Sequence, residues 1–274
     1  MACSISAEVT DFSVWGQAAW GLERVCICCF RIGIPARRDR EDKMGQSEII
    51  RKLTAAFITG DRWQLYLKGL GVTLQVAVMA AVLGVIIGTA VAFMKISVRK
   101  NGKKTLLAHI ANIYIDIIRG TPSVLQVMIM YFAILSNSKN GVLIAGLSFG
   151  INSGAYVAEI IRAGILAVDK GQTEAGRSLG LSNFQTMCNI IIPQAFKNVL
   201  PPLVNEFIVL LKETAIVGYV GLSDLTRVAN QIASKTYDFF TPMIGAAVIY
   251  FVIIKILTKL LERLERRMRR SDNR

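Results

Sequence analysis

Long apolar stretches separated by short polar ones dominate the chain. The run from Val72 to Met94 contains no charged residue, and at about 1.5 Å per residue a helix of that length crosses the roughly 30 Å hydrocarbon layer of a bilayer. Because an apolar segment in lipid must satisfy its own backbone hydrogen bonds, it is expected to be helical. Four further stretches are predicted to span in the same way: 110–135, 142–168, 200–222 and 239–261. The pattern predicts an all-α integral membrane protein with about five transmembrane helices.

The first predicted span also carries a face of small residues. Gly84, Gly88 and Ala92 recur at a spacing of four, which places them on one side of a helix. Small residues let a second helix approach closely. We therefore expect a helix contact on this face and not only lipid.

Composition and charge agree with a membrane protein. Of the 274 residues, 53% are hydrophobic, and the mean hydropathy is +0.47. The net charge of +13 raises the alternative of nucleic-acid binding, but the basic residues lie at the ends of predicted spans and form no patch interleaved with aromatic residues. We expect a lipid bilayer, and no nucleic acid, as a partner of this chain.

The basic residues also predict the orientation of the chain. One cluster follows the first span at 99–104, and another follows the last span at 263–270. The positive-inside rule places both clusters in the cytoplasm. With five spans, the N-terminus and the loop 136–141 are then outside and the C-terminus is cytoplasmic.

The chain divides into four segments by composition. Residues 1–43 resemble neither a signal peptide nor a span, and we expect a non-native or disordered extension there, with the natural start at Met44. Residues 44–68 are typical of an amphipathic, interfacial lead-in, 69–267 form the transmembrane domain, and 268–274 form a cytoplasmic tail. The five cysteines show no zinc-like spacing, so no metal site is expected.

Polar residues interrupt the second predicted span. Asp116 and Arg119 lie three positions apart on one helical face and are predicted to pair. Pro122 removes a backbone donor, and the Gly-Thr pair before it allows a bend. Near the inner surface, the charged side chains can also simply extend to the interface. The candidates for a polar pathway in this span are Arg119, Thr121, Pro122 and Gln126.

Charged residues also occur in the third and fourth predicted spans. Glu159 and Arg162 are predicted to pair at a spacing of three, either as a structural pair or as part of a pathway. An unpaired charge at membrane depth costs on the order of 2.5–3.5 kcal/mol, so Lys212 and Glu213 require a partner. That partner is a neighbouring span, a second subunit or a charged substrate group. The candidate pathway residues of these two spans are Asn152, Glu159, Arg162, Glu206, Lys212 and Glu213.

A polar insert, 169–193, separates the third and fourth spans. Asp169 lies three residues before a glutamine, the spacing of a capping box that opens a helix, and Gly180 is predicted to end that helix in a left-handed conformation. Ser182 repeats the opening signal, and the second helix is expected to run until Pro193 disturbs it. The insert is therefore predicted to be a cytoplasmic two-helix hairpin that fits a groove on another protein.

The insert resembles the EAA motif of ABC importer permeases. Gly176 stands where that family usually has a second alanine, and Ile192 stands where it has leucine. A glycine at this helical position costs up to about 1 kcal/mol relative to alanine, so we expect a looser first helix. The resemblance implies that the hairpin enters a cleft on an ATPase through the following residues: Glu174, Ala175, Gly176, Gly180, Leu181, Ile190 and Pro193.

Other stretches narrow the resemblance to the polar amino acid uptake branch: RGTP at 119–122, NSGAYVAEIIRAGI at 152–165 and NEFIVLLKET at 205–214. The resemblance implies a type I ABC importer permease fold and a multi-pass subunit of the bacterial cytoplasmic membrane that imports polar amino acids. The implied partners are a second permease subunit, identical or sister, two ABC ATPase subunits and an extracytoplasmic amino-acid-binding protein. No G-x-x-x-x-G-K-[ST] sequence occurs, so ATP hydrolysis is expected in a separate subunit, and we expect neither enzymatic activity nor a cofactor here.

Two other functional classes compete with this interpretation. An ion-coupled secondary transporter or channel would use Glu206, Lys212 or Glu213, and inverted repeats within the chain would favour it, but no convincing repeat is seen. An intramembrane enzyme needs a nucleophile with a base, or a metal cluster, and the single His109 supplies neither.

Overall fold

A computed structural model of the protein describes residues 47–96, 105–138 and 140–272. The predicted extension at 1–43 and the basic loop at 99–104 lie outside these residues. The chain divides into two units, Met1–Lys52 and Leu53–Arg274. In the first unit the described residues are helical and exposed, and Lys52 Nζ pairs with Glu48 Oε1 at 3.0 Å. The interfacial role of 44–68 stays a prediction.

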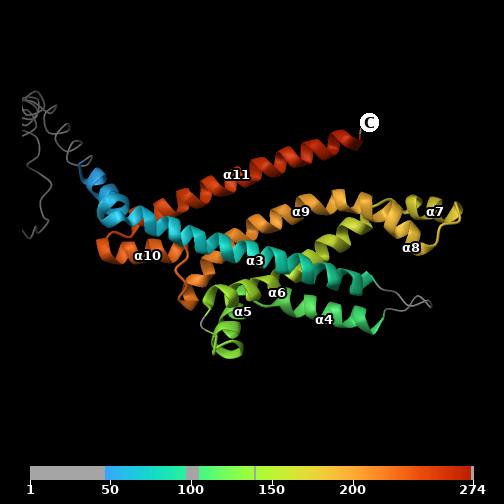
Figure 1. Ribbon diagram of the computed structural model, residues 1–274, viewed down its shortest axis with the longest axis horizontal. Coiled ribbons are helices and arrows are strands. Elements are labelled where there is room, and N and C mark those ends of the chain that lie inside the picture. Colours follow the sequence, from blue (N-terminus) through green and yellow to red (C-terminus); the bar gives the residue numbers. More distant parts are fainter. Residues whose placement is uncertain (1–46, 97–104, 139, 273–274) are drawn as a thin grey trace, which may run out of the picture. The chain divides into compact units, whose positions relative to one another are not determined.

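The second unit consists of helices, and its described residues contain no strand (Figure 1). Its elements in chain order are η1 (Thr54–Ile58), η2 (Thr59–Asp61), α3 (Arg62–Ile96), α4 (Leu106–Gly120), α5 (Ser123–Ile129), η3 (Met130–Ile134), α6 (Gly141–Leu166), α7 (Lys170–Ser178), α8 (Asn183–Thr186), η4 (Met187–Ile191), α9 (Ile192–Glu213), η5 (Thr214–Val220), α10 (Leu225–Thr236) and α11 (Phe240–Asp272). α3, α6 and α9 pack against one another, α10 lies against the first part of α3, and α7 and α8 lie at the opposite end.

Three described helical stretches are long and apolar enough to cross a membrane, namely Ser47–Ile96, Gly141–Leu166 and Phe240–Met268. The bent pair of α4 with α5 and η3 makes a fourth if it forms one span. These stretches correspond to four of the five predicted crossings, so an α-helical membrane architecture is confirmed. The fifth predicted crossing falls on α9 and η5. Both are helical, but charged residues interrupt α9, and a crossing there stays a prediction.

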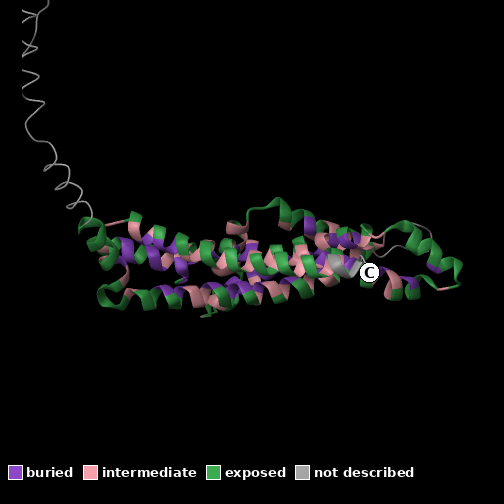
Figure 2. Cartoon of the chain, turned by 90° about the horizontal axis from the view of Figure 1, so that it is seen from above, coloured by how far each residue is buried: buried purple, intermediate pink, exposed green. Residues whose placement is uncertain are grey.

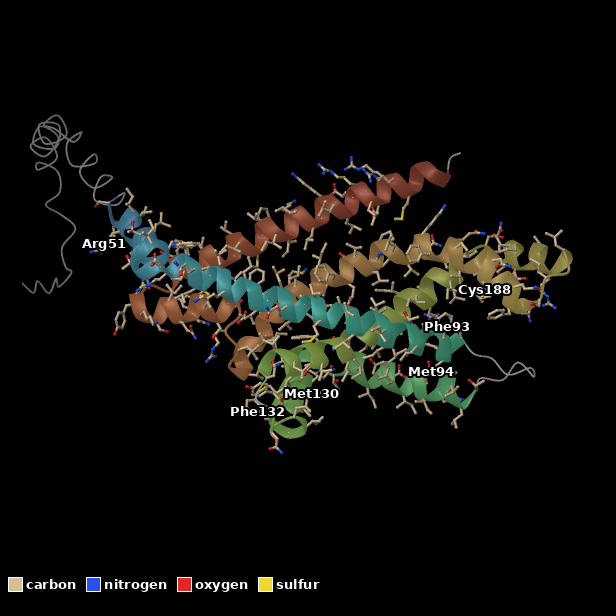
Figure 3. The ribbon with its side chains drawn as sticks, viewed as in Figure 1. Arg51, Phe93, Met94, Met130, Phe132 and Cys188 are labelled. Carbon is tan, nitrogen blue, oxygen red and sulfur yellow. The ribbon has the colours of Figure 1, made fainter. Side chains whose placement is uncertain are left out.

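The predicted bend in the second span is confirmed. α4 and the stretch Ser123–Ile134 meet at 104°. Thr121 has an extended backbone, with φ −119° and ψ 146°, which is the conformation that a residue before proline prefers. Its hydroxyl donates to the carbonyl of Ile117 at 2.9 Å and so satisfies an acceptor at the end of α4. Beyond the bend, Met130 and Phe132 lie on the π-helical turn η3 (Figure 3).

The small-residue face of α3 packs closely against α6. Gly84, Gly88 and Ala92 are all buried. A Cβ added to Gly88 would lie 2.6 Å from the Cβ of Val157, a separation that real side chains do not adopt. From the α6 side, a Cβ added to Gly150 would lie 2.7 Å from the Cβ of Leu83. The expected helix contact is therefore present, and glycines on both helices make it possible.

Buried apolar clusters follow α3 along its length. α6 is the most central candidate span, with 67% of its apolar window buried, whereas only 11% of the corresponding window of α11 is buried. Figure 2 shows where buried and exposed residues lie along the helices. α11 therefore presents its apolar side chains outward, as lipid-facing helices do.

Within the described part of the chain, three buried apolar clusters lie along α3, from the end near α10 to its other end. Representative members of the first are Tyr66, Leu225 and Ile232, of the second Val76, Phe149 and Leu210, and of the third Ala92, Ile115 and Ala158.

Substitution of Gly88 by alanine is expected to lower the melting temperature of the protein in lipid nanodiscs. The new methyl group would overlap the β-branched side chain of Val157, and overpacking of this kind costs about 1–3 kcal/mol. Gly71→Ala is the matched control, because it lies in the same helix and, apart from its chain neighbours and the backbone of its own helix, no atom lies within 4 Å of its added Cβ. Thermal unfolding of both variants measures the difference, and equal melting temperatures would contradict a tight α3–α6 contact.

Candidate functional site

The polar insert folds as two short helices joined at a glycine corner. α7 ends at Ser178, and Gly180, two residues further on, has a left-handed φ of 83°. The Leu181 N–H donates to the Gly176 carbonyl at 3.1 Å, and the Gly180 N–H donates to the Arg177 carbonyl at 2.9 Å. This is the Schellman arrangement that closes a helix at a left-handed glycine. At the start of α8, Ser182 and Gln185 form both hydrogen bonds of the predicted capping box.

The start of the hairpin and its end differ from the sequence-based expectation. Asp169 caps α7 by accepting from the Gly171 N–H at 2.7 Å, but Gln172 completes no capping box, because its side chain accepts from Gln194 at 3.2 Å. The second arm also does not stop at Pro193. A π-helical turn, η4, leads directly into α9, which contains Pro193 near its start, and the π-helical turn adapts the backbone before the proline.

Gly176 lies where the two arms of the hairpin meet, and it is the only buried residue of α7. A Cβ added there would lie 2.8 Å from the Cγ2 of Thr186, which is itself buried. The expectation that this glycine only loosens the first helix is therefore incomplete. Its missing side chain allows α7 to approach α8 and η4.

The outer surface of the hairpin is exposed and partly apolar. Leu179 and Phe184 flank the glycine corner with 80% and 77% of their surface exposed. Glu174 and Ala175 are exposed on α7, and the Glu174 carboxylate makes no hydrogen bond or ion pair within the described part of the chain. On the inner side, Ile190 is half-buried near Cys188 on η4 (Figure 3). Large apolar side chains are thus left exposed at the tip of the hairpin.

Three of the predicted pathway residues form one hydrogen-bonded group at the bend of the second span. The Asn152 amide donates to Gln126 Oε1 at 2.9 Å. The Gln126 amide in turn donates to the Thr121 hydroxyl at 2.7 Å and to the Ile118 carbonyl at 2.8 Å. Pro122 is the N-cap residue of the next helix, α5. The group satisfies a carbonyl that the bend releases, so it holds the broken span against α6.

The predicted pair of Asp116 with Arg119 is wrong. Both side chains are exposed, and among the described residues no ion pair joins them. Instead the Arg119 guanidinium lies over the ring of Tyr156, 5.3 Å from its centroid. An aromatic face on the neighbouring helix α6 attracts the cation, and a spacing of three along one helix does not reveal that neighbour.

The predicted pair of Glu159 with Arg162 is confirmed, and it has a third member. Arg162 donates to Glu159 Oε2 through Nη2 at 2.9 Å and through Nε at 3.1 Å. Lys95, at the end of α3, donates to the other carboxylate oxygen. The Glu159 side chain is only 20% exposed, so each partner matters more than in a surface pair. The sequence indicated Lys95 only as the first charge after an uncharged span.

Glu206 is held to α6, whereas Lys212 has no such partner. The Ser153 hydroxyl donates to Glu206 Oε1 at 3.0 Å. No carboxylate lies within 4 Å of Lys212 Nζ in the described chain, and Glu213 is half-buried beside it. Lys212 is exposed and lines a cavity of about 280 Å³ near the end of α9. The partner that the sequence analysis expected for Lys212 is therefore not found as an ion pair among the described residues.

α10 and the residues that it presents were not anticipated, although the sequence contained a signal. Asp224 caps the helix by accepting from the N–H groups of Thr226 and Arg227 at 2.9 and 3.1 Å. The buried positions that follow have the spacing of one helix face. These positions are Leu225, Val228, Ala229, Ile232 and Ala233.

Residues 80–270 match the family described as the binding-protein-dependent transport system inner membrane component. The chain belongs to this family. It is 42% identical over 209 residues to the arginine transport system permease protein ArtQ of Bacillus subtilis strain 168. This match covers 75% of this chain and 93% of ArtQ. It is 38% identical over 210 residues to the glutamine transport system permease protein GlnP of Escherichia coli K12. This match covers 75% of this chain and 93% of GlnP.

Solved structures agree with this membership. The crystal structure of an amino acid ABC transporter with histidines is 46% identical, with a TM-score of 0.69, and the match covers 74% of this chain and 94% of that one. An inward-facing structure of the MetNI methionine ABC transporter matches with a TM-score of 0.68 and 19% sequence identity. The match covers 77% of this chain and 99% of that chain, and it shows the fold alone. The type I ABC importer permease fold and the family resemblance are confirmed.

Family membership also decides between the functional classes. The chain is the inner-membrane permease subunit of an ATP-driven, binding-protein-dependent importer. It is a transport subunit and not an enzyme, and the family uses a separate ATPase and a binding protein. The alternatives of an ion-coupled secondary transporter and of an intramembrane enzyme are thereby set aside.

Substitution of Glu159 by glutamine is expected to reduce the free energy of unfolding by about 1.5–3 kcal/mol, because it leaves Lys95 and Arg162 without their shared carboxylate. Glu262→Gln removes the exposed ion pair of Glu262 with Arg266 and is expected to cost less than about 0.5 kcal/mol. Unfolding of both variants in the same lipid gives the comparison. A loss no larger for Glu159→Gln than for the control would contradict the structural weight of this triad.

Proposed function

We propose that this subunit imports a polar amino acid and that the hairpin 169–193 transmits the nucleotide cycle of two ABC ATPase subunits to the membrane helices. One observation carries the proposal. The second arm of the hairpin continues through η4 into α9 without a break. A force on the exposed hairpin therefore acts directly on a helix that packs inside the bundle.

The exposed surface of the hairpin is suited to a groove on a partner. Leu179 and Phe184 project from the two sides of the Gly180 corner. Burial of a large apolar side chain contributes about 1.5–3 kcal/mol, so these two side chains are sufficient anchors for a small docking element. Glu174 adds a charge that can pair with a basic residue of the ATPase.

α9 is also coupled to the other helices. Its first half packs against α6, where a Cβ added to Gly164 would lie 2.3 Å from Val199 Cγ2. Its middle is tied to α6 by the hydrogen bond of Ser153 with Glu206. Movement of α9 therefore shifts α6, which carries Asn152 and Glu159. These residues, with Gln126, Glu206, Lys212 and Glu213, are our candidates for the translocation path.

The remaining parts of the proposal concern orientation and partners. The C-terminal part of α11, which carries Arg263, Arg266 and Arg267, lies at the same end of the second unit as the hairpin (Figure 1). The positive-inside rule then supports a cytoplasmic hairpin and C-terminus, with the N-terminus outside. We further propose a second permease subunit, identical or sister, and an extracytoplasmic amino-acid-binding protein. The named substrates of the two relatives, arginine and glutamine, support a polar amino acid as substrate.

Phe184→Ala is expected to weaken retention of the ATPase subunits by about 10-fold to 100-fold, because it removes an apolar anchor from the docking surface. Phe239→Ala is the matched control, since Phe239 is 67% exposed but lies before α11 at the other end of the unit. Binding of the purified ATPase to each permease variant in nanodiscs measures the effect. Equal affinities for the two variants would contradict docking at the glycine corner.

Glu174→Arg is expected to abolish ATP-driven uptake while the protein remains in the membrane, because the reversed charge repels a basic ATPase surface. The measurement is uptake of labelled amino acids by proteoliposomes that contain the complete transporter. Glu262→Arg is the control, as it reverses an exposed glutamate outside the hairpin. Normal uptake by the Glu174 variant would count against a coupling role for this residue.

A further inference from the structure

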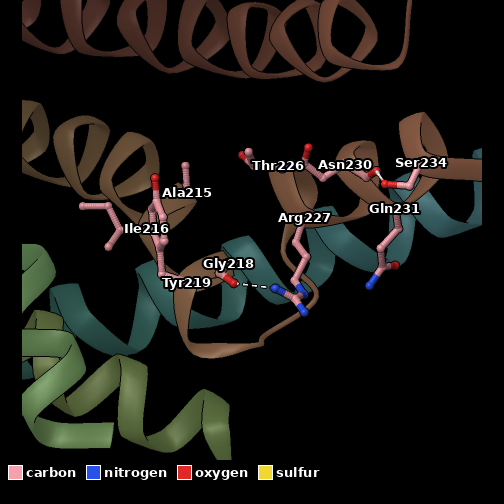
Figure 4. A pocket seen from close by; sticks show the side chains of 9 residues that line it. All are labelled: Ala215, Ile216, Gly218, Tyr219, Thr226, Arg227, Asn230, Gln231 and Ser234. Carbon is pink, nitrogen blue, oxygen red and sulfur yellow. Dashed lines mark hydrogen bonds between the residues drawn. The ribbon is translucent and has the colours of Figure 1, made fainter. Parts of the chain in front are cut away.

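A second polar feature lies at the end of the bundle opposite the hairpin. It is a pocket of about 750 Å³ between η5 and α10 (Figure 4). Ligand pockets in proteins commonly measure about 300–1,000 Å³, so an amino acid fits within this volume. Its lining consists of Ala215, Ile216, Gly218, Tyr219, Thr226, Arg227, Asn230, Gln231 and Ser234.

α10 places polar side chains in this pocket because its two faces differ. The face with Leu225, Val228 and Ile232 is buried in the core. The other face carries Thr226, Asn230 and Ser234 at a spacing of four, with Arg227 and Gln231 beside them. Core packing therefore fixes the helix, and its polar residues are free to face a ligand.

Arg227 is the only cation in the pocket lining, and no carboxylate is part of that lining. Its Nη1 donates to the Gly218 carbonyl at 2.7 Å, which holds the guanidinium in place, as Figure 4 shows. Its Nε is buried and has no hydrogen-bond partner in the described structure. A buried donor without a partner is unfavourable by about 1–3 kcal/mol.

The nearby acid Asp224 does not neutralise the guanidinium. Its two carboxylate oxygens accept from the backbone N–H groups of Thr226 and Arg227. Burial raises the pKa of the Asp224 carboxyl, against the lowering effect of these N–H donors. The positive charge of Arg227 is therefore available to an anionic group that enters from the pocket.

If Lys95 lies at one surface of the hydrocarbon layer, the pocket lies beyond the opposite surface. A Cβ added to Gly69 of α3 would lie 3.0 Å from the carbonyl oxygen of Asp224. Gly69 is about 39 Å along α3 from Lys95, which exceeds the roughly 30 Å thickness of the hydrocarbon. In the orientation proposed above, this surface is the one to which a binding protein delivers its ligand.

A second cavity continues from the pocket toward the bundle. It is the cavity of about 280 Å³ that Lys212 lines, and it shares Ala215 and Thr226 with the pocket. Tyr250 also lines it. Two cations, Arg227 and Lys212, neither of which forms an ion pair within 4 Å among the described residues, thus line adjoining cavities. An anion that leaves the first can be received by the second.

We propose that the pocket between η5 and α10 is a capture site that binds the carboxylate of the incoming amino acid through Arg227. The guanidinium nitrogens that are not buried can donate charge-assisted hydrogen bonds to the carboxylate. Asn230, Gln231 and Ser234 supply neutral donors and acceptors for the rest of the amino acid. Lys212 receives the carboxylate next. This inference rests on the proposed function and adds to it the place of first contact.

The test uses the complete permease–ATPase complex in nanodiscs, without binding protein, and L-glutamine and L-arginine as probes. Saturation-transfer NMR is expected to detect both probes on the wild-type complex. Arg227→Gln and Asn230→Asp are each expected to weaken binding about 10-fold or more, the first by removing the cation and the second by adding a repelling carboxylate. Arg227→Gln also removes the hydrogen bond to Gly218 and can impair folding. Asn230 is exposed, so Asn230→Asp tests the site independently of that contact.

Lys235→Gln is the matched control, because it also lowers the net charge by one on α10 but lies outside the pocket lining. It is expected to bind both probes as the wild type does. Unchanged binding by Asn230→Asp, with a wild-type transporter that imports either probe, would overturn the capture site and leave the proposed function standing. A wild-type complex that imports no amino acid with its binding protein and ATP would overturn both.

Discussion

The close contact between α3 and α6 is the constraint on which the rest of the structure depends. Lipid tails give helices no hydrophobic reason to associate, so packing and interhelical hydrogen bonds must hold them together. Glycines on both helices supply that packing. Because the backbones approach so closely, Ser153 of α6 lies against Gly84 of α3 and still reaches Glu206 of α9. One small residue thereby connects three helices, and α6 becomes the frame that positions Asn152 and Glu159.

α9 connects the two ends of this frame. It begins at the hairpin through η4 and ends at η5, which forms one wall of the pocket with Arg227. A helix of 22 residues is about 33 Å long, which is close to the thickness of the hydrocarbon layer. The charged residues that give α9 less apolar character than a usual span are also those that meet Ser153 and line the cavity beside the pocket. Charged residues within a membrane helix are tolerated where they face other helices or a cavity, as Glu206 and Lys212 do.

The sequence predicted what depends on local chemistry. The left-handed Gly180, the capping box at Ser182 and the bend before Pro122 are set by residues within a few positions, and all three are present. Contacts between distant residues were not predictable in the same way. Lys95 meets Glu159 only after α3 and α6 have packed, and Arg119 turns to Tyr156 because that ring lies on another helix. The continuation of the helix past Pro193 also depends on context, since the π-helical turn before it adapts the backbone.

The arrangement of charges explains why one rigid helix can serve both ends of the subunit. At the end near the hairpin, the Glu159 carboxylate pairs with both Lys95 and Arg162. At the other end, Arg227 and Lys212 have no carboxylate partners within the described chain, so a ligand with a carboxylate completes that region. If α9 moves as one body, a change at the hairpin alters the wall of the pocket. Thermodynamic linkage then requires the reverse, that an amino acid in the pocket alters the affinity of the hairpin for the ATPase.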